Sequence, residues 1–153
     1  MTGTSNLREL AVERYIAAPP AKVWHAMTER MPEWWCPKPW RIEIIEQDWR
    51  AGGRSAMTMH GPESESILNE GIFLEVTPGV RFVTTDALTA DWQPQGPMMV
   101  GIWEIRPEGT GTHYRAAARH WTDEAMEQHK AMGFKQGWSI CADQLARLVE
   151  ESA

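Results

Sequence analysis

The alternation of apolar and polar residues along the chain predicts about six to seven β-strands joined by short turns. Glycine or proline marks several of these turns, as at Ala51-Gly52-Gly53 and Pro78-Gly79. Strands linked by tight turns pair in antiparallel fashion. The predicted strands cover Leu7–Ala17, Arg41–Trp49, Arg54–His60, Ser66–Val76, Arg81–Ala87, Met98–Arg106 and Thr112–Trp121.

Helical spacing of apolar residues appears after the first strand. Pro19 and Pro20 suit the first turn of a short helix, where a missing N–H costs little. This helix must end near Met31, because Pro32 disfavours helical geometry in the residue before it. Residues 32–40 are rich in proline and tryptophan and predict neither a regular helix nor a central strand.

A long C-terminal helix is predicted from Thr122, a capping residue followed by two acidic residues, to about Glu151, with Gly133 as the candidate position of a bend. On a helical wheel its apolar residues fall within an arc of about 100°, the width of a stripe that faces a core. Gly133 and Gly137 flank the stripe, which predicts close approach of either a strand or a ligand. The stripe consists of Phe134, Trp138, Cys141, Leu145, Leu148 and Val149.

The order of one strand, short helices, further strands and a final helix predicts a single α+β domain over residues 1–153. The net charge is −6 and basic residues are scattered, which argues against a nucleic-acid groove. The N-terminal residues lack a signal-peptide core, and no apolar run approaches the roughly 20 residues of a membrane span. Because the chain has only two cysteines, we expect a cytoplasmic protein with free thiols.

The aromatic composition is unusual, because nine tryptophans outnumber three phenylalanines and two tyrosines, and nine methionines accompany them. Tryptophan supplies a large contact area and one N–H group, and methionine fills irregular spaces. Two interpretations fit this composition. One is a solid core built from these residues, and the other is a partly hollow core that faces a small apolar ligand.

Six motifs, taken in order, resemble those of the START-like (SRPBCC, helix-grip) superfamily and, within it, the family of activators of the heat-shock-protein-90 ATPase. They are PPAKVWHAMT, EWW with its following proline, DWRAGGR, EGIFLEVTPGVRFVTT, GTGTHY and MGFKQGWSICADQLARL. The resemblance implies a curved antiparallel sheet around the C-terminal helix, two short helices after the first strand, and a hydrophobic cavity between sheet and helix. Members include lipid carriers, hormone-binding proteins, polyketide cyclases and aromatases, and chaperone regulators, so the fold alone fixes no function.

Strand alternation within this fold predicts which side chains face the cavity. The resemblance places Trp103 and Ile105 inward, and small Ala116 and Ala118 across from the helix would leave volume for a pocket. Both faces of the strand Ser66–Val76 are apolar, so the direction of its side chains stays open. The predicted ligand-binding residues are Trp35, Met57, Met59, Phe82, Met99, Trp103, Tyr114, Ala118, His120, Phe134 and Trp138.

Candidate catalytic groups are few. Glu75 would have a raised pKa if it faced an apolar cavity, and it could then act as an acid or base. His120 is the one histidine that alternation places inward, with a satisfied core histidine as the alternative. Cys36 has no identifiable base, and Cys141 belongs to the apolar stripe, so neither is expected to be a nucleophile. No histidine pair has zinc-ligand spacing, and we expect no metal and no cofactor.

Three functions remain open at this point. The first is binding of a small hydrophobic or aromatic molecule in the cavity. The second is a polyketide cyclase-like enzyme in the same cavity, with His120, Tyr114 or Glu75 as acid or base. The third is a chaperone-regulating or other protein-interaction module, or a homodimer, because an apolar outward patch would serve as a partner surface. That patch would consist of Val100, Ile102 and Trp121.

Overall fold

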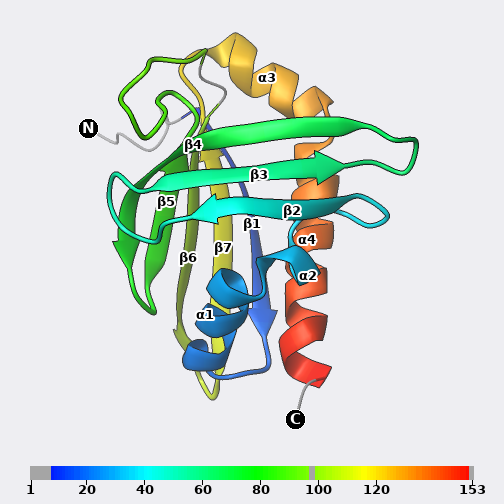
Figure 1. Ribbon diagram of the computed structural model, residues 1–153. Coiled ribbons are helices and arrows are strands. Elements are labelled where there is room, and N and C mark those ends of the chain that lie inside the picture. The colour runs from blue at the N-terminus through cyan, green and yellow to red at the C-terminus, as the bar shows by residue number, and fades with distance from the viewer. Residues whose placement is uncertain (1–7, 97–98, 152–153) are drawn as a thin grey trace.

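The computed structural model describes residues 8–96 and 99–151, which form one seven-stranded antiparallel sheet and four helices (Figure 1). The strand order is β1-β7-β6-β5-β4-β3-β2. The predicted strands are all present, although Leu7 and Met98, at which two of them were expected to begin, lie outside the described residues. The strands are β1 (Glu9–Ile16), β2 (Arg41–Gln47), β3 (Arg54–His60), β4 (Ser66–Thr77), β5 (Arg81–Thr85), β6 (Val100–Glu108) and β7 (Gly111–Arg119).

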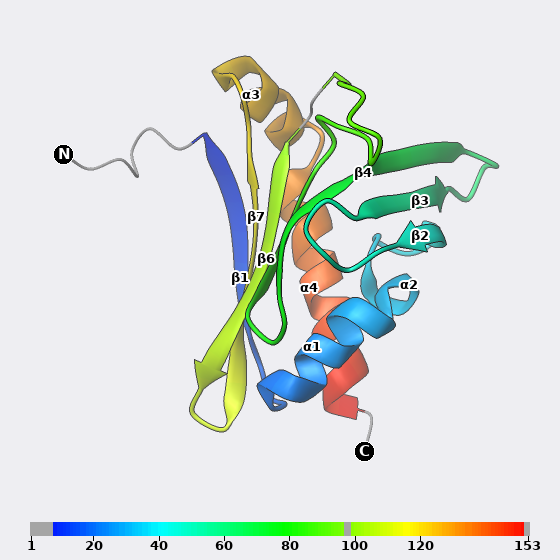
Figure 2. The ribbon, with the colours of Figure 1, turned by 60° about the vertical axis from the view of Figure 1, so that its left-hand side comes forward.

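The sheet bends around the long helix α4 (Phe134–Glu151), which confirms the predicted helix-grip arrangement. In Figure 2, β1, β6 and β7 lie on one side of α4, and β2, β3 and β4 lie on the other. The short helix α1 (Pro20–Glu29) packs against α4 toward the end where the chain finishes, and α2 (Met31–Trp34) packs beside the middle of α4. The helix α3 (Asp123–Ala131) lies at the opposite end.

The segment predicted to be irregular contains the single helical turn α2. Pro32 is tolerated there because it sits in the first turn, where its missing N–H has no intrahelical partner to lose. The fully buried Trp34 fastens α2 to α1, since its indole Nε1 donates a hydrogen bond to the carbonyl oxygen of Ala26 at 3.1 Å. The irregular geometry begins after α2, where Cys36 adopts a φ of 82°.

The predicted C-terminal helix is divided into α3 and α4, so the expectation of one continuous helix is wrong. Its start is as predicted, because the Thr122 side chain accepts a hydrogen bond from the Ala125 N–H at 3.0 Å. Gly133 then takes a φ of 91°, a left-handed conformation that L-residues with a side chain rarely adopt. Gly133 therefore ends α3 and redirects the chain into α4.

A β-bulge in β2 decides which of its side chains face α4. The pairing of β2 with β3 shifts between Ile44 and Glu46. A bulge of one residue reverses the faces of everything that follows it. Gln47 consequently pairs with Ser55 and shares its inward direction.

A second bulge explains why both faces of β4 appear apolar in the sequence. The pairing of β4 with β5 shifts between Phe73 and Glu75, so Phe73 points inward before the bulge and Val76 after it. Glu75 lies on the outer face, where its carboxylate is 2.8 Å from the guanidinium Nε of Arg81.

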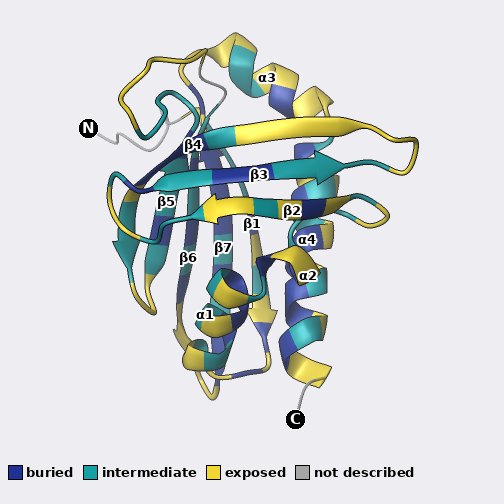
Figure 3. Ribbon diagram, in the orientation of Figure 1, coloured by how far each residue is buried: buried dark blue, intermediate teal, exposed yellow. Residues whose placement is uncertain are grey.

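Burial follows the predicted division into an apolar interior and a charged exterior (Figure 3). The apolar stripe of α4 is buried as predicted, with Leu148 half-buried at its edge. The outer face of the sheet carries a continuous row of ion pairs across β4, β5, β6, β7 and β1. The row links Glu75, Arg81, Glu104, Arg115, Glu9 and Arg119.

Candidate functional site

A cavity of about 430 Å³ lies between the sheet and the segment formed by α2, its following loop and α4. Its sheet wall comes from β2 to β6, and its helical wall comes from α2, the loop at Cys36 and Pro37, the α3–α4 junction and the first half of α4. The position follows from the bend of the sheet, since the β1 edge packs closely on α4 while β2 to β5 curve away from it.

Four aromatic rings pack against one another in the cavity wall. Trp103 stacks on Phe82 with a centroid distance of 5.1 Å and an interplanar angle of 18°, and on Trp138 at 5.3 Å and 16°. Trp35 meets the rings of Trp103 and Trp138 edge-on, at 5.4 Å and 5.2 Å. Offset stacking and edge-to-face contacts each contribute about 0.5–1.5 kcal/mol beyond burial. These contacts link β5, β6, α4 and the loop after α2 into one rigid apolar surface.

Uncharged polar side chains lie on the sheet wall and were not predicted. They are Gln47, Ser55, Asn69, Thr84 and Thr85. The Thr85 hydroxyl donates a hydrogen bond to the Met99 carbonyl oxygen at 3.1 Å. By contrast, both amide atoms of Gln47 and the indole Nε1 of Trp103 are buried without a hydrogen-bond partner in the protein.

The predicted ligand-binding residues divide into two groups. The first group lines the cavity and consists of Trp35, Met57, Met59, Phe82, Met99, Trp103 and Trp138. The second group, Tyr114, Ala118, His120 and Phe134, is buried in the core but does not line the cavity. For Tyr114 and Ala118 the reason is that β7 lies next to β1, against which α4 packs, so the inward side chains of β7 are covered.

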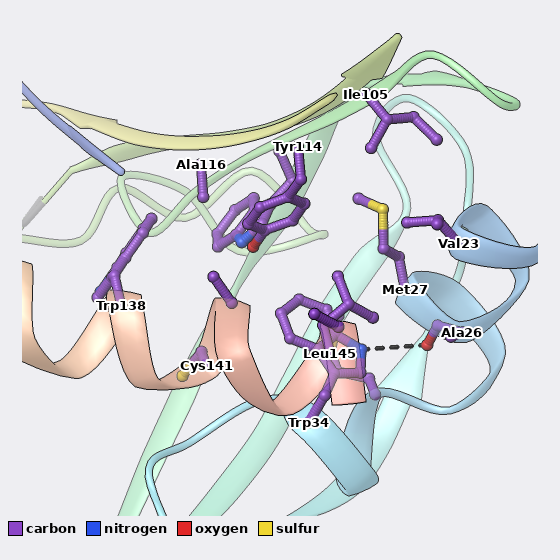
Figure 4. Close-up of a cluster of buried hydrophobic side chains, with 14 of the residues drawn as sticks. Val23, Ala26, Met27, Trp34, Ile105, Tyr114, Ala116, Trp138, Cys141 and Leu145 are labelled. Atoms are coloured by element: carbon purple, nitrogen blue, oxygen red, sulfur yellow. Dashed lines mark hydrogen bonds between the residues drawn. The ribbon is translucent and has the colours of Figure 1, made fainter. Parts of the chain in front are cut away.

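Tyr114 shows how this covering works. Its ring is fully buried and meets the ring of Trp34 edge-on at 6.4 Å, in a cluster that includes Leu145 and Cys141 (Figure 4). Burial, and to a smaller extent the nearby Cys141, raises the pKa of the Tyr114 hydroxyl well above its ordinary value. The hydroxyl oxygen has no hydrogen-bond partner. Tyr114 is therefore a packing residue.

His120 is a hydrogen-bonded core histidine, and its partner is His129 of α3, a residue that no sequence pattern marks as part of the site. The two rings approach with Nε2 of His120 at 2.9 Å from Nδ1 of His129. His129 lines the cavity, and Phe134 packs edge-on against it at 5.0 Å. Burial, with a smaller contribution from His120, lowers the pKa of His129 to about 4, so the ring is neutral at pH 7.

Glu75 does not reach the cavity. The Thr77 hydroxyl and the Arg81 guanidinium both donate hydrogen bonds to its carboxylate, and they hold its pKa below the ordinary value. A carboxylate in this position remains ionised on the outer surface. The alternative in which Glu75 acts as an acid inside the cavity is therefore wrong.

Both cysteines are free, buried and part of the cavity wall. Burial raises the pKa of the Cys36 thiol to about 11 and that of the Cys141 thiol to about 12. Since the thiolate is the nucleophile, neither group is activated at neutral pH.

The two glycines before Trp138 have different roles. Gly133 serves the turn between α3 and α4, as described above. Gly137 lies in α4 on the cavity wall, and a β-carbon there would stand 3.7 Å from Cγ of Pro37. The element that approaches Gly137 is thus the loop after α2, and neither a strand nor a ligand is needed to explain the close approach.

The outward apolar patch is only partly exposed. Val100 and Ile102 are half-buried, and Trp121 is 49 % exposed. Across residues 8–96 and 99–151, no group of three or more His, Cys, Asp or Glu side chains is arranged to hold a metal ion. None of the described helices combines the length and apolarity needed to cross a bilayer.

Comparison with known proteins places the chain in a family. The sequence profile described as "Activator of Hsp90 ATPase homolog 1-like protein" matches residues 17–150. A crystal structure of a protein from Nitrosomonas europaea is similar, with 36% identity, a TM-score of 0.87 and coverage of 96% of each chain.

More distant structures share the fold. One from Mycobacterium smegmatis has 21% identity and a TM-score of 0.80, and covers 97% of this chain and 94% of its own. One from Arthrobacter aurescens has 18% identity and a TM-score of 0.83, and covers 97% of this chain and 89% of its own. No curated protein matches the chain. With the profile spanning most of its length, the chain belongs to the Activator of Hsp90 ATPase homolog 1-like family of the START-like superfamily.

Proposed function

We propose that this protein binds one small hydrophobic or aromatic molecule in the cavity between the sheet and α4. The observation that carries the proposal is the cavity of about 430 Å³ with a wall of tryptophan, phenylalanine and methionine side chains. Ligand pockets typically measure about 300–1,000 Å³ and are lined by such residues. The fold, shared with its family, supports ligand binding in general.

Binding is favoured over the enzymatic alternative by the positions of the candidate acids and bases. Glu75 lies on the outer face, Tyr114 is enclosed in the core, and His120 uses both ring nitrogens for hydrogen bonds within the protein. None of the three is available to exchange a proton with a molecule in the cavity, which is what acid–base catalysis requires.

The test uses N-phenyl-1-naphthylamine, an uncharged apolar dye whose fluorescence rises in an apolar site. We expect saturable binding of one dye molecule, with energy transfer from the tryptophans of the wall. Gly137→Leu should abolish it, because Gly137 and its neighbour Pro37 both line the cavity and a leucine side chain needs space that the wall does not provide. The fold should be kept, since leucine favours a helix more than glycine does.

The matched control is Gly96→Leu. A β-carbon at Gly96 has no neighbour within 4 Å, and the residue is exposed and is not among those that line the cavity. This variant should bind the dye as the wild type does. The proposal fails if the wild-type protein gives no saturable signal, or if Gly137→Leu binds the dye with unchanged affinity.

A further inference from the structure

Two buried polar groups of the cavity wall have no hydrogen-bond partner, and they belong to different strands. One is the side-chain amide of Gln47 at the end of β2, in which both Oε1 and Nε2 are buried and unpaired. The other is the indole Nε1 of Trp103 on β6, a residue only 6% exposed. Native proteins leave few such groups, because burying an unpaired polar atom destabilises the fold.

The backbone places Gln47 on the face of the sheet that lines the cavity. The β2 bulge turns Gln47 inward, and it begins a row across three strands that continues through Ser55 and Gly71. All three residues line the cavity. Both neighbours in this row are small, and neither gives the buried amide of Gln47 a hydrogen-bond partner.

The charges around the cavity favour an uncharged occupant. Among the described residues that line it there is no lysine or arginine, and His129 is neutral at pH 7. The carboxylates on the wall have partners, since Glu70 lies 3.0 Å from the Arg54 guanidinium and Asp86 accepts a hydrogen bond from the Met99 N–H at 3.2 Å. An anion would meet no cation, and a cation would compete with existing contacts.

We propose that Gln47 and Trp103 are the polar anchor of the binding site, and that its ligand is an uncharged planar aromatic molecule with a hydrogen-bond acceptor beside a donor, as in a primary carboxamide. The side-chain amide of Gln47 carries an NH₂ donor and a carbonyl acceptor on the same carbon. A matching ligand therefore places an acceptor opposite the NH₂ group and a donor opposite the carbonyl oxygen. The indole of Trp103 adds a second donor for the acceptor side of the ligand. The inference rests on the proposed function, since it names the chemistry of that same cavity.

The experiment compares two probes of equal shape, 2-naphthamide and its hydrocarbon analogue 2-isopropenylnaphthalene. Affinities are measured by displacement of N-phenyl-1-naphthylamine from the wild type and from Gln47→Met, which keeps the length of the side chain and removes its hydrogen bonds. We expect the ratio of amide to hydrocarbon affinity to fall about tenfold in Gln47→Met. Gln128→Met, the same change at an exposed site on α3, should leave the ratio unchanged.

A measurement on the wild type does not depend on the folding of a variant. In a nitrogen-15 spectrum, the indole N–H signal of Trp103, assigned through Trp103→Phe, should move to lower field with 2-naphthamide and not with the hydrocarbon. Both probes could bind while the ratio of amide to hydrocarbon affinity and the Trp103 indole signal stay unchanged. That result would overturn the polar anchor and leave the proposed function standing. If neither probe displaces the dye nor binds directly, both proposals fall.

Discussion

His120 and His129 share a hydrogen bond between Nε2 of the first and Nδ1 of the second, 2.9 Å apart. The other nitrogen of His120, Nδ1, lies 3.0 Å from the carbonyl oxygen of Arg8. A carbonyl only accepts, so His120 must donate from Nδ1, and in the neutral pair its Nε2 accepts from His129. The pair joins the segment before β1, the end of β7 and α3 at one end of the cavity.

The histidine pair predicts that acid destabilises the protein through His129. An unfolded histidine takes up a proton near pH 6.5, whereas the pKa of folded His129 is about 4. Between these values the unfolded state binds more protons, so the free energy of unfolding must fall as the pH falls. At pH 5 we expect a loss of roughly 2 kcal/mol relative to pH 7.5. Urea unfolding at the two pH values measures it.

Other groups also titrate between pH 7.5 and pH 5. The contribution of His129 to the loss of stability is therefore measured with a variant that lacks its ring. His129→Gln keeps an N–H for His120 and removes the titrating ring, so its loss of stability between pH 7.5 and pH 5 should be smaller than that of the wild type. His25→Gln, at an exposed position of α1, should lose as much as the wild type. Equal losses for the wild type and His129→Gln would contradict the assignment.

The glycine pair before Trp138 predicts opposite effects of one substitution. Gly133→Ala forces a β-carbon into a left-handed conformation with a φ of 91° and should destabilise the protein by about 1–2 kcal/mol. Gly137→Ala should stabilise it by about 0.5 kcal/mol, because alanine favours a helix and the new β-carbon meets Pro37 only at ordinary contact distance. Urea unfolding of both variants decides this, and equal effects would mean that the α3–α4 turn is not what selects glycine at Gly133.

Much of the fold could be predicted from the sequence, because its strands and the stripe of α4 follow simple periodicities. The position of β3 and the burial of Trp138, Cys141 and Leu145 follow directly from residue order. The interruption of the C-terminal helix lies at Gly133, where a bend was predicted, but the complete division into two helices was not predicted, because a glycine inside a helical pattern does not reveal its φ angle. Only the chain geometry around Gly133 does.

The candidate site was harder to predict for two physical reasons. The bulge in β2 reverses its faces after Ile44, so simple alternation places Gln47 outward although it lines the cavity. Because the sheet is curved, the cavity lies beside β2 to β6 and not beside β7. Tyr114 and Ala118 on β7 are therefore packed in the solid core. Neither a bulge nor a curvature leaves a clear mark in a single sequence.

Because both free cysteines are buried in the cavity wall, we predict that they react slowly with thiol reagents. Burial raises the pKa of Cys36 to about 11 and that of Cys141 to about 12, so both are thiols at pH 8. Ellman's reagent should react with the native protein at least about 100-fold more slowly than with the guanidinium-unfolded chain. The native rate should rise with pH up to pH 10. Rapid labelling of one native thiol at pH 8, located with Cys36→Ala and Cys141→Ala, would show an activated cysteine that the structure does not explain.

The contrast between two buried aromatic residues provides a prediction about the core under the cavity. The Tyr114 hydroxyl is buried without a partner, so Tyr114→Phe removes an unsatisfied group and should stabilise the protein by about 1 kcal/mol. Trp34→Phe removes a buried N–H that donates to Ala26 and leaves a void, so it should destabilise by about 2–4 kcal/mol. Thermal and urea unfolding compare the two. If Tyr114→Phe is destabilising instead, the hydroxyl has a hydrogen-bonded partner in solution, and a water molecule in this cluster becomes the simplest explanation.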